Sequence, residues 1–192
     1  MSQIGIFFGT DSGTTRLIAK KIAKQIKSRL GDGVVAKPLN VNRAEAADLL
    51  GYRALILGTP TYGEGVLPGR DNDTDEAAWL EFLPKLDGAD FSGTRIALFG
   101  LGDQEKYPTH FCDAMMELHR IFSAAGAELV GGIDVTGFEF KRSAAVVDGR
   151  FIGLALDQHL QHLLTDARID AWLDEVLPLL LAVCAEPEAT TA

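Results

Sequence analysis

Residues 4–15 read Ile-Gly-Ile-Phe-Phe-Gly-Thr-Asp-Ser-Gly-Thr-Thr, an apolar run followed by a loop of small and hydroxylated residues. The run 4–8 predicts a buried strand. After the loop, Ile18, Ile22 and Ile26 recur every four residues, which predicts a helix over 14–30 with one buried stripe. Unpaired N–H groups and the dipole at the start of a helix favour an anion, and the loop hydroxyls add donors. The stretch therefore predicts a strand–loop–helix unit that holds a phosphate group.

The loop lacks the patterns of two common phosphate-binding classes. It has neither the G-x-x-x-x-G-K-[ST] sequence of P-loop nucleotidases nor the G-x-G-x-x-G sequence of dinucleotide-binding domains. It also contains no lysine or arginine. Such a loop suits a terminal phosphate that is held in place and is not transferred.

Apolar runs and helical patterns alternate along most of the chain. This alternation, with short links, predicts a doubly wound α/β domain in which helices cover both faces of a parallel sheet. The expected strands are 4–8, 34–36, 54–58, 95–99 and 129–133, and the expected helices are 14–30, 44–50, 76–86, 110–125 and 166–185.

The composition is that of an ordinary globular protein, since the 192 residues are 47% hydrophobic and 23% charged. The net charge of −9 argues against nucleic acid as a partner. Residues 14–30 hold six basic residues and no acid, whereas 59–76 hold five acids and one arginine.

Two cysteines, the lack of a signal-peptide pattern and the lack of an apolar stretch of about 20 residues predict a cytoplasmic protein with no membrane span.

Two links are unusually long for a compact domain, and long links are usually functional. One is 59–75. The other is 134–165, where the run 151–156 follows Asp148-Gly149, a hairpin signal. In an open parallel sheet, ligands bind at the carboxyl ends of the strands. We therefore expect the links after the first, third and fourth strands to form one site.

The segments 6–22, 58–63 (Gly-Thr-Pro-Thr-Tyr-Gly), 99–104 (Phe-Gly-Leu-Gly-Asp-Gln) and 148–157 resemble the flavodoxins, small carriers that bind FMN. The resemblance extends to about Leu181. It implies a flavodoxin-like three-layer α/β fold with a five-stranded parallel sheet in the order 2-1-3-4-5. The last block is similar to the segment that interrupts the fifth strand of long-chain flavodoxins. We expect one domain over 1–185 and a disordered tail at 186–192.

The resemblance also implies a site for non-covalent FMN, with Tyr62 and Tyr107 flanking the flavin ring. The residues themselves show no catalytic constellation, and no cysteine or carboxylate completes a metal site beside His159 and His162. The predicted cofactor-binding residues are Thr10, Asp11, Ser12, Gly13, Thr14, Thr15, Thr59, Pro60, Thr61, Tyr62, Gly63, Leu101, Gly102, Asp103, Tyr107, His110 and Phe111.

The implied function is low-potential one-electron transfer between the semiquinone and hydroquinone of FMN. Negative charge from the phosphate, Glu64 and Asp103 would disfavour the fully reduced anion. We expect a monomer whose acids on 59–76 and 103–105 dock on basic surfaces of redox proteins, such as a flavoprotein or iron–sulfur reductase. The link 63–77 looks like an insertion in flavodoxins of nitrogen-fixing bacteria, which suggests nitrogenase as an acceptor.

Two other classes of protein share features with such a carrier. An FMN-dependent NAD(P)H quinone reductase is the alternative, and it would need a pocket for the hydride donor. A signalling receiver domain shares the strand order but needs a phosphorylatable aspartate at the end of the third strand. That strand ends in Gly58-Thr59, which excludes the receiver.

Overall fold

The N-terminal apolar run lies in the middle of a parallel sheet. The computed structural model describes residues 3–72 and 74–185. The strands of the sheet are β1 (Ile4–Phe8), β2 (Leu39–Asn40), β3 (Ala54–Pro60), β4 (Arg95–Gly102) and β5 (Glu128–Val130). They pair in the order β2-β1-β3-β4-β5, and every pairing is parallel. The predicted order 2-1-3-4-5 is confirmed.

The fifth position of the sheet is shared by two segments. β5 pairs with Arg95–Ala97 of β4, and β9 (Leu154–Asp157) pairs with Phe99–Gly102 of the same strand. The chain between them forms a small antiparallel sheet of β6 (Ile133–Asp134), β7 (Val146–Val147) and β8 (Arg150–Phe151). Its hairpin turns at Asp148 and Gly149, which have φ angles of 50° and 77°. The predicted interruption of strand 5 is therefore confirmed.

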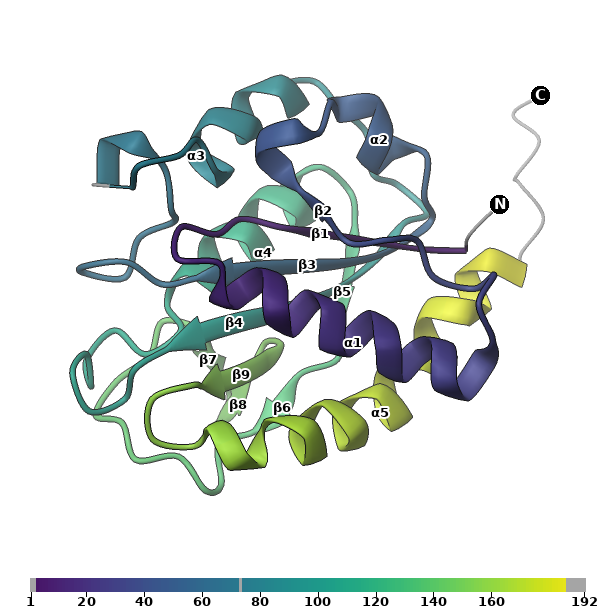
Figure 1. The fold of residues 1–192 in the computed structure, drawn as a ribbon. Coiled ribbons are helices and arrows are strands. Elements are labelled where there is room, and N and C mark those ends of the chain that lie inside the picture. The colour runs from purple at the N-terminus through teal and green to yellow at the C-terminus, as the bar shows by residue number, and fades with distance from the viewer. Residues whose placement is uncertain (1–2, 73, 186–192) are drawn as a thin grey trace.

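Helices cover both faces of the sheet, as Figure 1 shows. α1 (Thr14–Leu30) and α5 (Thr165–Ala185) lie on one face. α2 (Ala46–Leu50), α3 (Trp79–Phe82) and α4 (Ala114–Ala124) lie on the other. The described residues also form the short 3₁₀ segments η1 (Val41–Arg43), η2 (Arg70–Asn72), η3 (Leu83–Leu86) and η4 (His162–Leu164).

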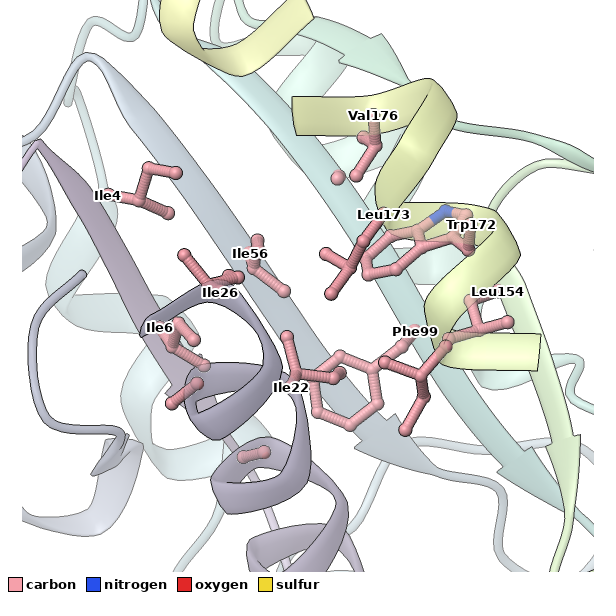
Figure 2. Close-up of a cluster of buried hydrophobic side chains, with 14 of the residues drawn as sticks. Ile4, Ile6, Ile22, Ile26, Ile56, Phe99, Leu154, Trp172, Leu173 and Val176 are labelled. Carbon is pink, nitrogen blue, oxygen red and sulfur yellow. The ribbon is translucent and has the colours of Figure 1, made fainter. Parts of the chain in front are cut away.

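The isoleucine stripe of α1 faces the core, as its spacing predicts. In Figure 2, Ile22 and Ile26 lie between β1 and α5, close to Ile56 and Leu173, and all four side chains are fully buried. Burying an aliphatic side chain of this size contributes about 1.5–3 kcal/mol. Packing against the sheet and α5 therefore holds α1 in place and fixes the position of the loop before it.

Several element boundaries differ from the sequence prediction. Between 34 and 36, only Val35 forms a strand-like bridge, to Ile4, and β2 begins at Leu39 instead. Pro38 has no N–H to donate to a ladder, which accounts for the interruption. The helix expected from residue 110 begins at Ala114, because Cys112 has a φ of 57°, which a right-handed helix does not allow. The tail predicted at 186–192 lies outside the described residues.

Candidate functional site

The loop between β1 and α1 presents unpaired hydrogen-bond donors at the start of α1. Gly13 has a φ of 88°, which turns the chain into the helix, and its N–H donates to Oγ1 of Thr10 over 3.1 Å. Oγ of Ser12 lies 3.3 Å from Oγ1 of Thr14, and no side chain caps the helix. Within the described part of the chain, the amides of Ser12, Thr14 and Thr15 have no hydrogen-bond partner. Amides, hydroxyls and the helix dipole together form a cradle for an anion.

The links after β1, β3 and β4 meet at the carboxyl ends of the strands, around a cavity of about 190 Å³. The cavity thus lies where the sequence analysis places the site. Its lining consists of Thr10, Asp11, Ser12, Thr14, Thr15, Pro60, Thr61, Tyr62, Leu101, Gly102, Asp103, Tyr107 and Gln158.

Three further residues of the predicted set shape the cavity from just outside it. Gly13 makes the turn into α1. The fully buried Thr59 donates from Oγ1 to the carbonyl of Pro60 over 2.9 Å. Gly63 has a φ of 44° and lies in a turn closed by two backbone hydrogen bonds of 3.0 Å between Tyr62 and Val66. Gly63 has nothing within 4 Å of the position of an added Cβ.

The structure does not bring His110 and Phe111 to this cavity, which differs from the sequence prediction. Phe111 is fully buried, and its ring stacks on that of Phe140 at a centroid distance of 5.6 Å. Phe138 and Phe151 of the same insertion also contact it. Nδ1 of His110 lies 3.1 Å from Oδ2 of Asp113. Phe111 is buried because it packs against the aromatic rings of the insertion. These rings are distant from Phe111 in the sequence, so its local pattern did not predict this burial.

Gln158 lines the cavity and was not predicted. It directly follows β9, and its Nε2 donates to Oγ1 of Thr165 over 2.6 Å. The signal that could have identified it is the one used for the other links, a polar residue at the carboxyl end of a parallel strand. The sequence prediction missed Gln158 because the resemblance places 148–157 in the segment that interrupts strand 5, whereas Leu154–Asp157 returns to the main sheet beside β4.

Asp11 connects the phosphate loop to the long link after β3. Its Oδ2 accepts a hydrogen bond of 2.9 Å from the Tyr62 hydroxyl, and its Oδ1 accepts one of 3.3 Å from the amide of Asp75. Burial, then the hydrogen bond and the charge of Asp11, raise the pKa of Tyr62 above its ordinary value of 10.0. Tyr62 is therefore a neutral phenol held over one side of the cavity.

The link after β4 is fixed by buried polar groups. The amide of Gln104 donates to Oδ2 of Asp157 over 3.1 Å, and both residues are almost fully buried. Oδ1 of Asp157 accepts from the amides of His159 and Leu160. The amide of Tyr107 donates to the carbonyl of Asp103 over 2.9 Å. These bonds hold Tyr107 on the opposite link from Tyr62.

The family model for flavodoxin matches residues 6–172. The chain belongs to the flavodoxin family. A flavodoxin of Klebsiella pneumoniae is 46% identical over 176 residues, which are 92% of this chain and 97% of the relative. A flavodoxin of Synechocystis sp. is 38% identical over 180 residues, which are 94% and 99% of the two chains.

The fold of this flavodoxin is also that of solved members. A crystal structure of Fusobacterium nucleatum flavodoxin bound to flavin mononucleotide has 32% sequence identity and a TM-score of 0.81, over 93% of this chain and 99% of that one. Flavodoxins are electron carriers and not enzymes. Within residues 3–72 and 74–185, no helix has both the length and the apolarity needed to cross a bilayer.

Proposed function

We propose that this flavodoxin binds FMN non-covalently and carries single electrons at low potential. The observation that supports this most directly is the cradle at the start of α1. A phosphate dianion needs donors and positive potential, and the loop supplies unpaired amides, four hydroxyls and a helix N-terminus. Residues 10–15 contain no lysine or arginine, so the donors that the loop itself supplies are all uncharged.

The residues around the cavity fit the rest of the cofactor. The phosphate would be held by residues 10–15, and the flavin ring would lie between Tyr62 and Tyr107, whose flat faces suit an aromatic plate. Pro60, Thr61, Leu101, Gly102, Asp103 and Gln158 would border it, while Gly13, Thr59 and Gly63 would act through the backbone. The cavity is smaller than the roughly 300–1,000 Å³ of sites that enclose a ligand. Part of the ring would stay accessible to a redox partner.

When bound, FMN supplies one-electron transfer, and we propose that it alternates between its one-electron-reduced and fully reduced forms. This chain's part is to make added negative charge costly. Asp11 and Asp103 line the cavity, and Glu64 is exposed on the adjoining turn. One negative charge about 10 Å away costs about 1.7 kcal/mol at an effective dielectric near 20, which corresponds to about 70 mV.

The partners we propose are redox proteins with basic surfaces. The acidic surface, defined as Glu64, Asp71, Asp75, Asp103 and Glu105, lies on two of the three links that form the cavity, those after β3 and β4. Charge complementarity would steer a flavoprotein or iron–sulfur reductase to the accessible side of the ring. The acidic link 63–77 supports nitrogenase as one acceptor. We further propose a cytoplasmic monomer, which agrees with the two free thiols, Cys112 and Cys184.

The test compares FMN with riboflavin, which has the same ring and no phosphate. Purified protein should show flavin absorption, and calorimetry on the cofactor-free protein should give an affinity for FMN at least about 100-fold above that for riboflavin. The reason is that hydrogen bonds to a charged group contribute about 1.5–3 kcal/mol each. Thr15→Val should reduce the difference between the affinities for FMN and for riboflavin. Equal affinities would rule out the cradle, and rapid NAD(P)H oxidation in the presence of a quinone would favour the reductase alternative.

A further inference from the structure

The basic helix noted in the sequence borders a groove that the proposed function does not use. Two adjoining cavities, of about 600 and 450 Å³, lie between α1 and the segment 37–43 and share Lys20, Lys37 and Pro38. We call this hollow the basic groove. We propose that it is a second docking surface, which takes a carboxylate-rich segment of a protein partner.

The groove concentrates positive charge, most of which has no ion-pair partner among the residues that the structure describes. Its lining includes six cations, Arg16, Lys20, Lys24, Lys27, Lys37 and Arg43, against two acids, Asp32 and Glu76. Of the six, Lys27 alone is ion-paired with a residue that the structure describes, Asp32 at 3.8 Å.

On the neighbouring side of α1, by contrast, the cations are ion-paired. Lys21 pairs with Asp166 over 2.7 Å, and Arg29 pairs with Asp170 and Asp174, all three on α5. These cations serve packing within the protein. Apart from Lys27, the cations of the groove form no such ion pair with a described residue, and clustering them in a chain of net charge −9 does not help solubility.

The chemistry of the groove favours carboxylates over phosphates. Four of its cations are lysines, which act as hydrated point charges and pair with carboxylates as well as with phosphates, so the preference for a carboxylate-rich peptide comes from the other features of the groove. Its floor is partly apolar, with Ala23, Pro38 and Leu39. From Arg16 to Lys27 the helix rises about 16 Å, the length of about five extended residues. The net charge of the whole chain would repel the continuous phosphate backbone of a nucleic acid.

The position of the groove would allow a partner to bind there without covering the proposed cofactor site. α1 begins at the phosphate loop and runs away from it along the sheet (Figure 1). An acidic partner seated along α1 would therefore leave the cavity between Tyr62 and Tyr107 accessible. The carrier could be held by one partner while it exchanges electrons through the acidic surface with another.

The test measures binding of a fluorescent oligoglutamate peptide to FMN-loaded protein at low salt. The groove variant is Lys20→Gln/Lys24→Gln/Lys37→Gln. The matched control, Lys21→Gln/Lys85→Gln/Lys141→Gln, removes three lysines outside the groove. The groove variant should weaken binding about tenfold, as expected for the loss of three exposed charge pairs, and the control should weaken it less than about threefold. Both variants should retain the FMN content of the parent.

Three outcomes would overturn the proposal. Equal weakening in both variants would mean that net charge, and not the groove, binds the peptide. Tighter binding of tripolyphosphate or of a short DNA duplex of similar charge would identify a phosphate site. No binding to the parent at low salt would remove the surface altogether. None of these outcomes bears on the proposed FMN site, because the cofactor content is measured separately.

Discussion

Individual side chains of this flavodoxin join loops that are far apart in the sequence. Asp11 belongs to the phosphate loop, yet its two oxygens accept from Tyr62 and from the amide of Asp75. One carboxylate thus couples the cradle to the link that carries a proposed ring contact and part of the acidic surface. Its role is to position Tyr62, and its removal should be visible in the titration of that tyrosine.

Asp11→Asn should lower the pKa of Tyr62, because the charge and the hydrogen bond of Asp11 both favour the protonated phenol. In the parent, an unfolded tyrosine titrates near 10 while folded Tyr62 stays neutral, so the stability that Tyr62 contributes declines as the pH rises above about 10. The variant should show a smaller decline. The measurement is phenolate absorbance, with denaturant unfolding at several pH values. Asp71→Asn, on the exposed part of the same link, is the control, and a parent-like titration for Asp11→Asn would refute the coupling.

Gly58 is required for close packing of β3 against β4. A Cβ at this position would lie 2.0 Å from Cζ of Phe99, its register partner, which is fully buried. Gly58→Ala should reduce the free energy of unfolding by about 1–3 kcal/mol or more, measured by urea denaturation. Gly33→Ala, where nothing lies within 4 Å of the added methyl group, should change it by no more than about 0.5 kcal/mol. Similar values for the two variants would contradict this account.

At the scale of elements, α1 is held in the fold by two of its sides. Its isoleucine stripe packs on the sheet, and one flank is tied to α5 by Arg29, which donates to the carboxylates of Asp170 and Asp174 and to the Asp170 carbonyl. Arg95 of β4 extends this tie by donating to the carbonyl of Leu179 on α5 over 2.9 Å. The two helices therefore share one face of the sheet as a connected unit.

Arg29→Gln should destabilise this pair of helices by about 0.5–1.5 kcal/mol, since Arg29 is only 22% exposed and has several acceptors. The loss should shrink as salt is added, because screening weakens the parent ion pairs. Lys24→Gln removes the same charge from an exposed position on α1 and is expected to be nearly neutral. The check is denaturant unfolding at low and high salt. A larger effect for Lys24→Gln would show that net helix charge matters more than the tie to α5.

For the molecule as a whole, charge is separated into two surfaces. The basic groove runs along α1, and the acidic surface lies on the links around the cavity. Each surface can steer its own partner, because the attraction exerted by a patch is set by its local excess of charge and not by the total charge of the molecule.

Asp71→Asn/Asp75→Asn should slow electron transfer to a basic c-type cytochrome by roughly threefold to tenfold at low ionic strength. The difference should vanish near 1 M salt, where the Debye length is about 3 Å. Stopped-flow oxidation of the reduced protein measures the rate. The control, Asp32→Asn/Asp87→Asn, removes the same charge elsewhere on the surface. An equal slowing in the control would show that the acidic surface has no special part in docking.

Much of the fold followed from local patterns. The four-residue spacing in 14–30, the continuous apolar runs of β1, β3 and β4 and the Asp148-Gly149 turn each predict an element that the structure contains. The position of the cavity also followed from the sequence, because the carboxyl ends of parallel strands share one edge of the sheet.

What the sequence by itself determined is therefore the local part: the cradle, the order of the elements and the two opposite charge clusters. Only the tertiary structure decided that Phe111 joins the aromatic cluster of the insertion, that Gln158 borders the cavity, and that Asp11 reaches Tyr62. The physical reason is that strand and helix periodicity arise from neighbours along the chain. The burial of one ring, or the pairing of one carboxylate, depends on groups that only folding brings within reach.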